Sequence, residues 1–192
     1  RPAAGLGWWE FFERSYNYGA PAALLLLHGW GRSLKDWLEP LRTVPRLSPL
    51  QTEKFLWVFR IVVALMLIGH GGYGAFLVKK NLLGHYGSVG LGDFGLPLET
   101  WRAGIGFFEI GLGVAALFTL RPGFYLFVFT WKLAAELLHV PAGAEGAWWE
   151  VIERGGCYMV PLAVICVIHA LRRRCPSPDA GGLVACSRYQ VS

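Results

Sequence analysis

Charged and imidazole side chains occur within stretches of this sequence that are otherwise apolar. Ionisable groups are costly inside a lipid bilayer, so they are candidate functional residues where they occur. Lys132, Glu136 and His139 are spaced by four and three residues, which places them on one face of a helix. At about 1.5 Å per helical residue, other polar groups reach a similar depth in neighbouring apolar stretches. The candidate intramembrane cluster comprises His70, Glu109, Lys132, Glu136, His139, Glu153 and Arg154.

This cluster could serve as an ion pair that locks helices together, or as a site for proton handling or quinone contact. In the first case Glu109 or Glu136 pairs with Arg154 or Lys132, because an unpaired charge is not tolerated there. A metal is not predicted, since carboxylate metal sites in helix bundles need a second Glu-x-x-His motif and further glutamates. His70 alone matches His139 in depth, and packing histidines are preferred over haem ligands. No catalytic residue is assigned.

The composition indicates what positions this cluster. Of the 192 residues 54% are hydrophobic and only 16% are charged, against roughly 25% charged residues in soluble domains. Aromatic residues at 15% exclude disorder, and four cysteines are too few for a disulfide scaffold. The net charge of +5 is small and dispersed, so nucleic acid is not an expected partner. The class of protein that remains is an integral membrane protein surrounded by lipid.

The apolar segments predict an all-α fold, a polytopic membrane bundle with five transmembrane helices. Each crossing needs about 20 mostly apolar residues. The basic segment at 31–54 and the three arginines at 172–174 place both regions in the cytoplasm, although Lys79 and Lys80 oppose this arrangement. The N-terminal end of the chain is then outside and the C-terminus is cytoplasmic. The five predicted spans are residues 11–30, 55–78, 101–120, 124–140 and 150–171.

The sequence contains an internal repeat. Residues 8–23 (WWEFFERSYNYGAPAA) and 148–163 (WWEVIERGGCYMVPLA) match at 8 of 16 positions without a gap. Glu13 and Arg14 are thus the repeat equivalents of Glu153 and Arg154. We therefore expect residues 1–30 to be the last helix of an N-terminal repeat unit that is mostly missing from the sequence. Residues 31–54 are then a cytoplasmic linker, 55–172 a four-helix unit and 173–192 a flexible tail.

The four-helix unit resembles the DoxX-like family of four-helix membrane proteins, here in a tandem-duplicated form. The first helix carries Arg60 near its start and a glycine-rich end, GHGGYG at 69–74. The second carries Glu109 within the glycine-rich apolar run FFEIGLG at 107–113. The resemblance implies a redox-associated protein of the bacterial cytoplasmic (inner) membrane. It does not imply a particular substrate.

Three functions remain open. The first is an accessory or structural subunit of a larger bioenergetic complex, bound to other membrane subunits. Nine tryptophans favour this, because surplus aromatic surface suits lateral contacts. The second is a quinone-interacting subunit of a membrane oxidoreductase, and the third is a small-molecule transporter, suggested by the repeat. No intrinsic cofactor is predicted, while a bound quinone or lipid is an expected ligand.

Overall fold

The fold was analysed in a computed structural model that describes residues 6–28, 31, 33–38, 48–77 and 80–174. These residues are helical or lie in turns, and no strand occurs among them, which confirms the all-α prediction. The elements are α1 (Leu6–Glu13), α2 (Ser15–His28), α3 (Leu34–Leu38), α4 (Pro49–Phe76), α5 (Lys80–Ser88), the 3-10 helix η1 (Leu91–Phe94), α6 (Leu98–Phe118), α7 (Pro122–Leu137), α8 (Ala147–Glu153) and α9 (Gly155–Arg174).

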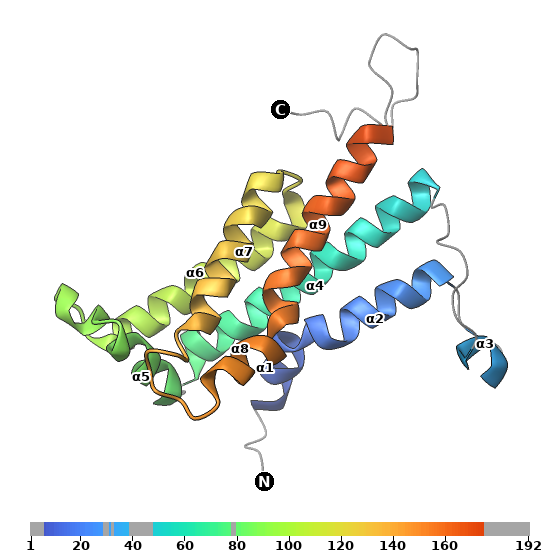
Figure 1. The fold of residues 1–192 in the computed structure, drawn as a ribbon. Helices are drawn as coiled ribbons and strands as arrows, with labels where there is room; N and C mark the ends of the chain where they lie inside the picture. Colours follow the sequence, from blue (N-terminus) through green and yellow to red (C-terminus); the bar gives the residue numbers. More distant parts are fainter. Residues whose placement is uncertain (1–5, 29–30, 32, 39–47, 78–79, 175–192) are drawn as a thin grey trace.

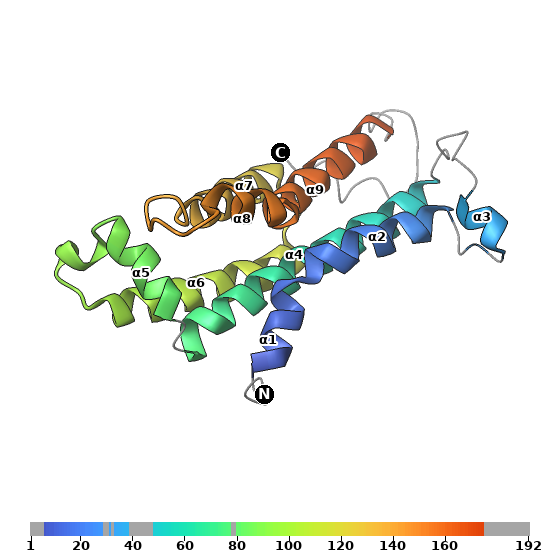
Figure 2. The same cartoon turned by 60° about the horizontal axis from the view of Figure 1, so that its bottom comes forward.

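The long helices form two layers, seen edge-on in Figure 2: α2, α4 and α6 lie in one layer and α7 and α9 lie in the other. Helix α4 is central, because it packs against α1, α2, α6 and α9. Helices α1, α5 and α8 gather at one end of the bundle, whereas α9 finishes at the opposite end (Figure 1). The end that holds α1, α5 and α8 also holds the candidate site.

The start of α4 is fixed by a capping box. The Ser48 Oγ accepts a hydrogen bond from the Gln51 backbone N–H at 3.2 Å, and the Gln51 Oε1 accepts one from the Ser48 N–H at 2.9 Å. Pro49 occupies the first helical turn, where its missing N–H carries no penalty. Helix α4 therefore begins six residues before the expected span at 55, within the segment that the sequence analysis assigned to the linker.

Close contact between α4 and α6 depends on glycine. A Cβ added at Gly106 would lie 2.3 Å from the Ala75 backbone nitrogen, so only glycine fits between the two backbones. This close approach is typical of small residues in membrane helix pairs. The buried Arg60 of α4 adds a polar link, because it donates from Nε to the Ala116 carbonyl at 3.2 Å and from its guanidinium to the Leu117 carbonyl.

Three segments are long and apolar enough to cross a membrane, namely Leu50–Phe76, Leu98–Phe118 and Ala147–Arg173. They contain most of the expected spans 55–78, 101–120 and 150–171, which identifies a membrane protein. Helices α2 and α7 have 14 and 16 residues, fewer than the roughly 20 that a crossing needs. The predicted five spans are therefore not confirmed. Residues 39–47 and 175–192, which include most of the expected tail, lie outside the described residues.

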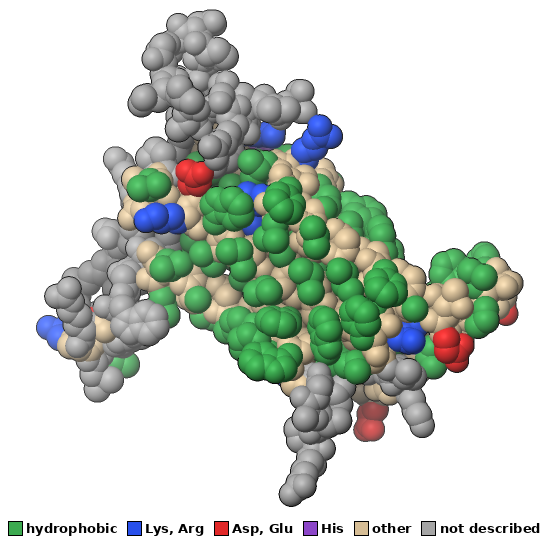
Figure 3. Space-filling view, turned by 180° about the vertical axis from the view of Figure 1, so that it is seen from behind, with side chains coloured by type: hydrophobic (Ala, Val, Ile, Leu, Met, Phe, Trp, Pro, Cys, Tyr) green, Lys and Arg blue, Asp and Glu red, His purple; other side chains and the backbone are tan. Residues whose placement is uncertain are grey.

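The surface agrees with a lipid environment. Figure 3 shows hydrophobic side chains over one broad face, with most charged side chains toward its edges. Large exposed aromatic residues such as Phe107 and Phe118 of α6 contribute to the apolar surface. In water such a surface would promote aggregation, whereas in a bilayer it contacts acyl chains.

The two halves of the sequence repeat fold alike. Helix α1 ends at Glu13 and α2 starts at Ser15, while α8 ends at Glu153 and α9 starts at Gly155, so both segments break at the equivalent arginine. A proline stands inside each following helix, at Pro21 in α2 and at Pro161 in α9. Helices α1 and α8 lie at the same end of the bundle (Figure 1).

Side-chain hydrogen bonds and ion pairs also recur at equivalent positions of the two repeat segments. The Tyr18 hydroxyl donates to the carbonyl of Phe11 at 2.7 Å, and the equivalent Tyr158 hydroxyl donates to the carbonyl of Val151 at 3.1 Å. Each breaking arginine also pairs with the glutamate four residues earlier, at 3.0 Å in α1 and 3.2 Å in α8. The same residues thus produce the same bent helix twice, as expected of a duplicated segment.

Candidate functional site

A buried charged centre lies between α6 and α7. The Lys132 Nζ is 3.6 Å from Glu109 Oε1 and 3.7 Å from Glu136 Oε1. The three side chains are between 1% and 4% exposed, so these charges are almost fully removed from solvent. The i, i+4 spacing of Lys132 and Glu136 produces one contact within α7, and Glu109 comes from the facing helix. One cation thus neutralises carboxylates from two elements.

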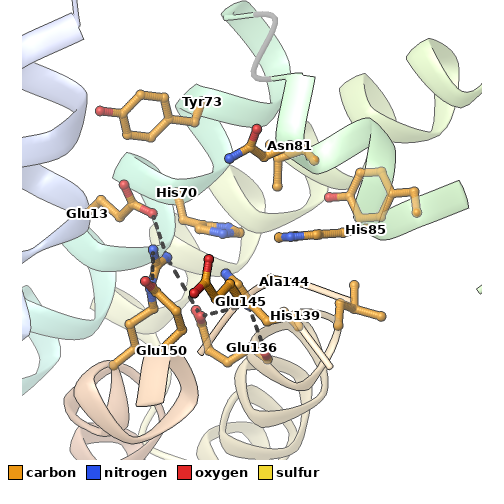
Figure 4. Close-up of a pocket in the computed structure, with 15 residues that line it drawn as sticks. Glu13, His70, Tyr73, Asn81, His85, Glu136, His139, Ala144, Glu145 and Glu150 are labelled. Atoms are coloured by element: carbon orange, nitrogen blue, oxygen red, sulfur yellow. Dashed lines mark hydrogen bonds and ion pairs between the residues drawn. The ribbon is translucent and has the colours of Figure 1, made fainter. Parts of the chain in front are cut away.

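Arg154 extends this centre to the break between α8 and α9. Its guanidinium lies 3.7 Å from Glu136, 4.0 Å from Glu13 and 3.2 Å from Glu150. Figure 4 shows the three carboxylates converging on one guanidinium at the edge of a pocket. Because Glu13 belongs to the N-terminal repeat segment, this arginine connects the two repeat segments as well as α7 and α8. On the α9 side of the centre, the Cys157 thiol lies 3.6 Å from Glu136 Oε1.

The carboxylate of Glu109 has two further partners on its other side. Its Oε2 is 2.5 Å from His70 Nδ1, and its Oε1 accepts a hydrogen bond from Trp131 Nε1 at 3.0 Å. Both oxygens are therefore engaged. A carboxylate that holds one imidazole nitrogen fixes the orientation and tautomer of the ring, which leaves the second nitrogen to exchange a proton with a neighbour.

Two more histidines lie near the mouth of the site. The rings of His85 and His139 have centroids 4.4 Å apart, and His139 Nδ1 is 2.9 Å from the carbonyl oxygen of Glu136. Burial lowers the pKa of His85 from its ordinary value, and His139 and Arg154 lower it further, against the opposing effect of Glu136. His85 therefore favours its neutral form.

A polar cavity of about 220 Å³ adjoins the charged centre. Figure 4 shows His70 and His85 projecting into it from opposite sides, with Tyr73 and Asn81 behind them. Its other polar lining groups come from α1, α5 and the segment from α7 to the α8–α9 break, and they are Glu13, Tyr86, Glu136, His139, Glu145, Glu150 and Arg154. The cavity is thus suited to water and to mobile protons.

An apolar cavity of about 300 Å³ lies beside the polar one. Its walls are formed by residues of α6, α7 and the segment between α5 and η1, including Trp101, Ile105, Trp131 and Ala134. His70, Tyr86 and Glu109 are the ionisable groups in its lining. A cavity that is mostly apolar with a few convergent polar groups is the usual form of a small-molecule site.

The two cavities share part of one wall. His70, Tyr86, Ala135 and Leu138 line both of them. Burial raises the pKa of Tyr86 to about 12, and the charge of Glu109 adds to this effect, so the phenol stays protonated and can donate a hydrogen bond. A group bound in the apolar cavity could therefore exchange a proton with the polar cavity through a single imidazole.

The residues predicted from sequence are mostly brought together. His70, Glu109, Lys132, Glu136, His139 and Arg154 form one contiguous group, and the repeat residue Glu13 joins it through Arg154. Glu153 does not, because its side chain is exposed and lines neither cavity. Arg14 is also exposed and pairs with Glu10.

Sequence reasoning missed several residues of the site. Trp131 and Tyr86 were not identified, although Trp131 directly precedes Lys132 in the sequence. His85 was not among the predicted site residues, and it lies in α5 (Lys80–Ser88), outside the five predicted spans. Glu150 stands four residues before Arg154, a spacing that predicts an ion pair. This last signal was available in the repeat motif itself.

Within the described residues, no group of three or more histidine, cysteine, aspartate or glutamate side chains is arranged to hold a metal ion. The chain matches no family model, no curated protein and no solved structure. The fold and the site alone define its class, a helical membrane protein with a buried charged centre between a polar and an apolar cavity.

Proposed function

We propose that this chain is the quinone-interacting subunit of a larger membrane bioenergetic complex. The observation that supports this most strongly is the apolar cavity whose lining includes the hydrogen-bonded pair His70 and Glu109. A quinone has a flat apolar ring with two oxygens that need hydrogen-bond partners, and the cavity offers both kinds of contact.

The dimensions suit a ring of this kind. A volume of about 300 Å³ is at the small end of ligand sites in proteins, roughly 300–1,000 Å³. It accommodates a substituted ring, while an isoprenoid tail would extend along α6 and α7 into lipid. Trp101 and Trp131 supply flat aromatic surface for the ring, and Ile105 and Ala134 supply aliphatic contacts.

Proton exchange is the chemistry assigned to this chain. A quinol that loses electrons must also release two protons, and His70 stands between its cavity and the polar one. Glu109 Oε2 lies 2.5 Å from His70 Nδ1 and holds the imidazole in place. From there, the route continues to the histidines and carboxylates of the polar cavity.

Electron transfer is assigned to another subunit, so the proposal requires a larger complex. The exposed aromatic residues of α6 and of α8, including Phe118, Trp148 and Trp149, provide surface for lateral contacts as well as for lipid. The role of accessory subunit expected from the sequence is thus combined with quinone binding, and no intrinsic cofactor is assigned.

The proposed topology follows from the charge distribution in the sequence. Two further crossings, by α1 with α2 and by α7 with the turn after it, would complete five spans in the bacterial cytoplasmic membrane. The C-terminus is then cytoplasmic and the site lies in the outer half of the bilayer. The DoxX-like resemblance of residues 55–172 supports this reading.

The test is quinone content. The full chain is purified from its native membrane in mild detergent, and its organic extract is analysed by mass spectrometry. We expect a stoichiometric quinone in the natural protein and its loss in Ala134→Trp, which fills the apolar cavity. Val114→Trp, at an exposed position of the same bundle, should retain the quinone. Equal quinone content in both variants would contradict the proposal.

A second variant separates a chemical role of Glu109 from a structural one. Glu109→Gln should leave the complex assembled and abolish quinol turnover, because it removes the negative charge that faces His70 Nδ1. Loss of assembly in this variant would show that the ion pair is structural, and the proton-exchange role would then fail.

A further inference from the structure

The bent segment α1–α2 exposes a face that its repeat equivalent α8–α9 buries. Cys157 and Val164 of α9 are at most 2% exposed. Their equivalents, Asn17 and Leu24 of α2, are exposed, and Leu24 retains 55% of its accessible surface. Pro161 is likewise buried and Pro21 exposed. Two segments with matching sequence and matching bends thus differ in what covers them.

Helix α7 packs against this buried face of α8–α9. Glu136 of α7 contacts the guanidinium of Arg154 at 3.7 Å and the thiol of Cys157 at 3.6 Å. Seven residues earlier in α7, the ring of Phe129 packs edge-on against Tyr158 with centroids 6.4 Å apart. A carboxylate and an aromatic ring two helical turns apart are thus the anchors that hold α7 on this face.

The equivalent side chains on α1–α2 indicate that a helix similar to α7 packs there as well. Arg14 is the equivalent of Arg154, and its side chain is 55% exposed beside Glu10. Tyr18, the equivalent of Tyr158, is 39% exposed. The face therefore presents a cation and an aromatic ring in the arrangement to which α7 binds in the other repeat segment, together with the apolar side chain of Leu24.

We propose that the face formed by Phe11, Arg14, Asn17, Tyr18, Pro21 and Leu24 binds a transmembrane helix of a partner subunit with the chemistry of α7. The partner helix carries an aspartate or glutamate at the level of Arg14 and an aromatic residue seven positions earlier. The attraction is a carboxylate for a guanidinium in a low-dielectric surrounding, with apolar contacts on either side.

The opposite side of the repeat gives independent support. The face by which α2 packs on α4 includes Gly19, where an added Cβ would lie 2.2 Å from Val62. The equivalent position in α9 is Met159, which is 53% exposed, and Ile152 in α8 is 63% exposed. The partner would then supply two helices. One, similar to α7, would cover the exposed face of α1–α2, and the other, similar to α4, would cover the exposed face of α8–α9.

A second copy of this chain does not meet the requirement. Its own α7 is already covered by its own α9 over Glu136 and Phe129. An α7 placed on α1–α2 of another copy would have to leave that position. The proposed occupant is therefore not α7 of a second copy, and the inference does not depend on quinone binding.

Photo-crosslinking in native membranes tests the proposal. The full chain carries benzoylphenylalanine at Leu24, or at Val114, an exposed control position on α6, and crosslinked peptides are sequenced by mass spectrometry. We expect Leu24 to crosslink to an apolar helix with an acidic residue and an aromatic residue seven positions before it, and Val114 not to reach that helix. Crosslinks from Leu24 to lipid alone, to a second copy, or to a helix without the acidic residue would overturn the proposal.

A charge reversal adds a quantitative test. Arg14→Glu places a carboxylate opposite the partner carboxylate and should lower the Leu24 crosslinking yield at least tenfold. Glu10→Gln removes the other partner of Arg14 within the chain and should leave the yield unchanged. Because both side chains are half exposed, the unfolding temperatures of the two variants should match. An unchanged yield in Arg14→Glu would refute the role of the arginine.

Discussion

Replacing Lys132 by methionine tests the energetics of the buried charged centre. The change preserves the length and most of the volume of the side chain but removes the cation between two carboxylates. The Lys132 Nζ lies 3.6 Å from Glu109 Oε1. At an effective dielectric of about 20, unit charges at this distance attract by about 4.6 kcal/mol. The second carboxylate, at 3.7 Å from Nζ, adds a similar attraction, and desolvation of the ammonium offsets part of the sum.

The expected net result is a loss of about 3–5 kcal/mol in the free energy of unfolding, as for other buried pairs broken from one side. It is measured by reversible denaturation in mixed micelles, with Arg173→Met as the control that removes an exposed cation from the end of α9. The double variant Lys132→Met with Glu109→Gln should recover part of the loss, because one of the two carboxylates that faced the ammonium is then neutral.

Two results would refute this reasoning. The first is a loss in Lys132→Met no larger than that in Arg173→Met, which would show that the charges are hydrated rather than buried. The second is a double variant that is no more stable than Lys132→Met, which would show that the loss arises from packing instead of from unpaired charge.

Two further predictions concern helix α5, which lies beside the polar cavity, and the contact between α4 and α6. Because burial and positive neighbours lower the pKa of His85, the folded state is favoured while this ring is neutral, and the advantage is lost as the pH falls below the ordinary histidine value of about 6.5. The protection factors of α5 amides in hydrogen exchange, which correct for the pH dependence of intrinsic exchange, should therefore fall at acidic pH, and His85→Gln should abolish that dependence. Unchanged protection factors across this range would contradict the assignment. Gly106→Ala should destabilise the protein by about 1–3 kcal/mol, because its Cβ meets the α4 backbone, whereas Gly104→Ala, with open space around it, should be neutral or stabilising. Equal unfolding temperatures for the two variants would show that the α4–α6 contact is looser than described.

The sequence predicted the parts of the fold that follow from local patterns. Apolar length located the three membrane-crossing segments, and the spacing of Lys132, Glu136 and His139 placed their side chains on one face. The depth argument also placed Glu109 level with Glu136, and both carboxylates contact Lys132 Nζ in the structure.

Other features could not be read from one sequence. The exposure of Glu153, which lines neither cavity, depends on how α8 packs, and the position of this residue in the sequence does not reveal it. The position of α5 over the site depends on long-range packing, so the contact between His85 and His139 carried no local signal. The start of α4 was missed for a simpler reason, since its capping box at Ser48 lies in a segment judged only by its charges.

The central claim is that the apolar cavity beside His70 and Glu109 holds a quinone ring. Its most direct test is photolabelling of the native membrane protein with an azido-quinone, with the labelled residues located by mass spectrometry. We predict label on the cavity residues of α6 and α7, including Ile105 and Ala134, and its loss when unlabelled quinone is in excess. Label spread over the lipid-facing surface, or undiminished by competing quinone, would contradict the claim.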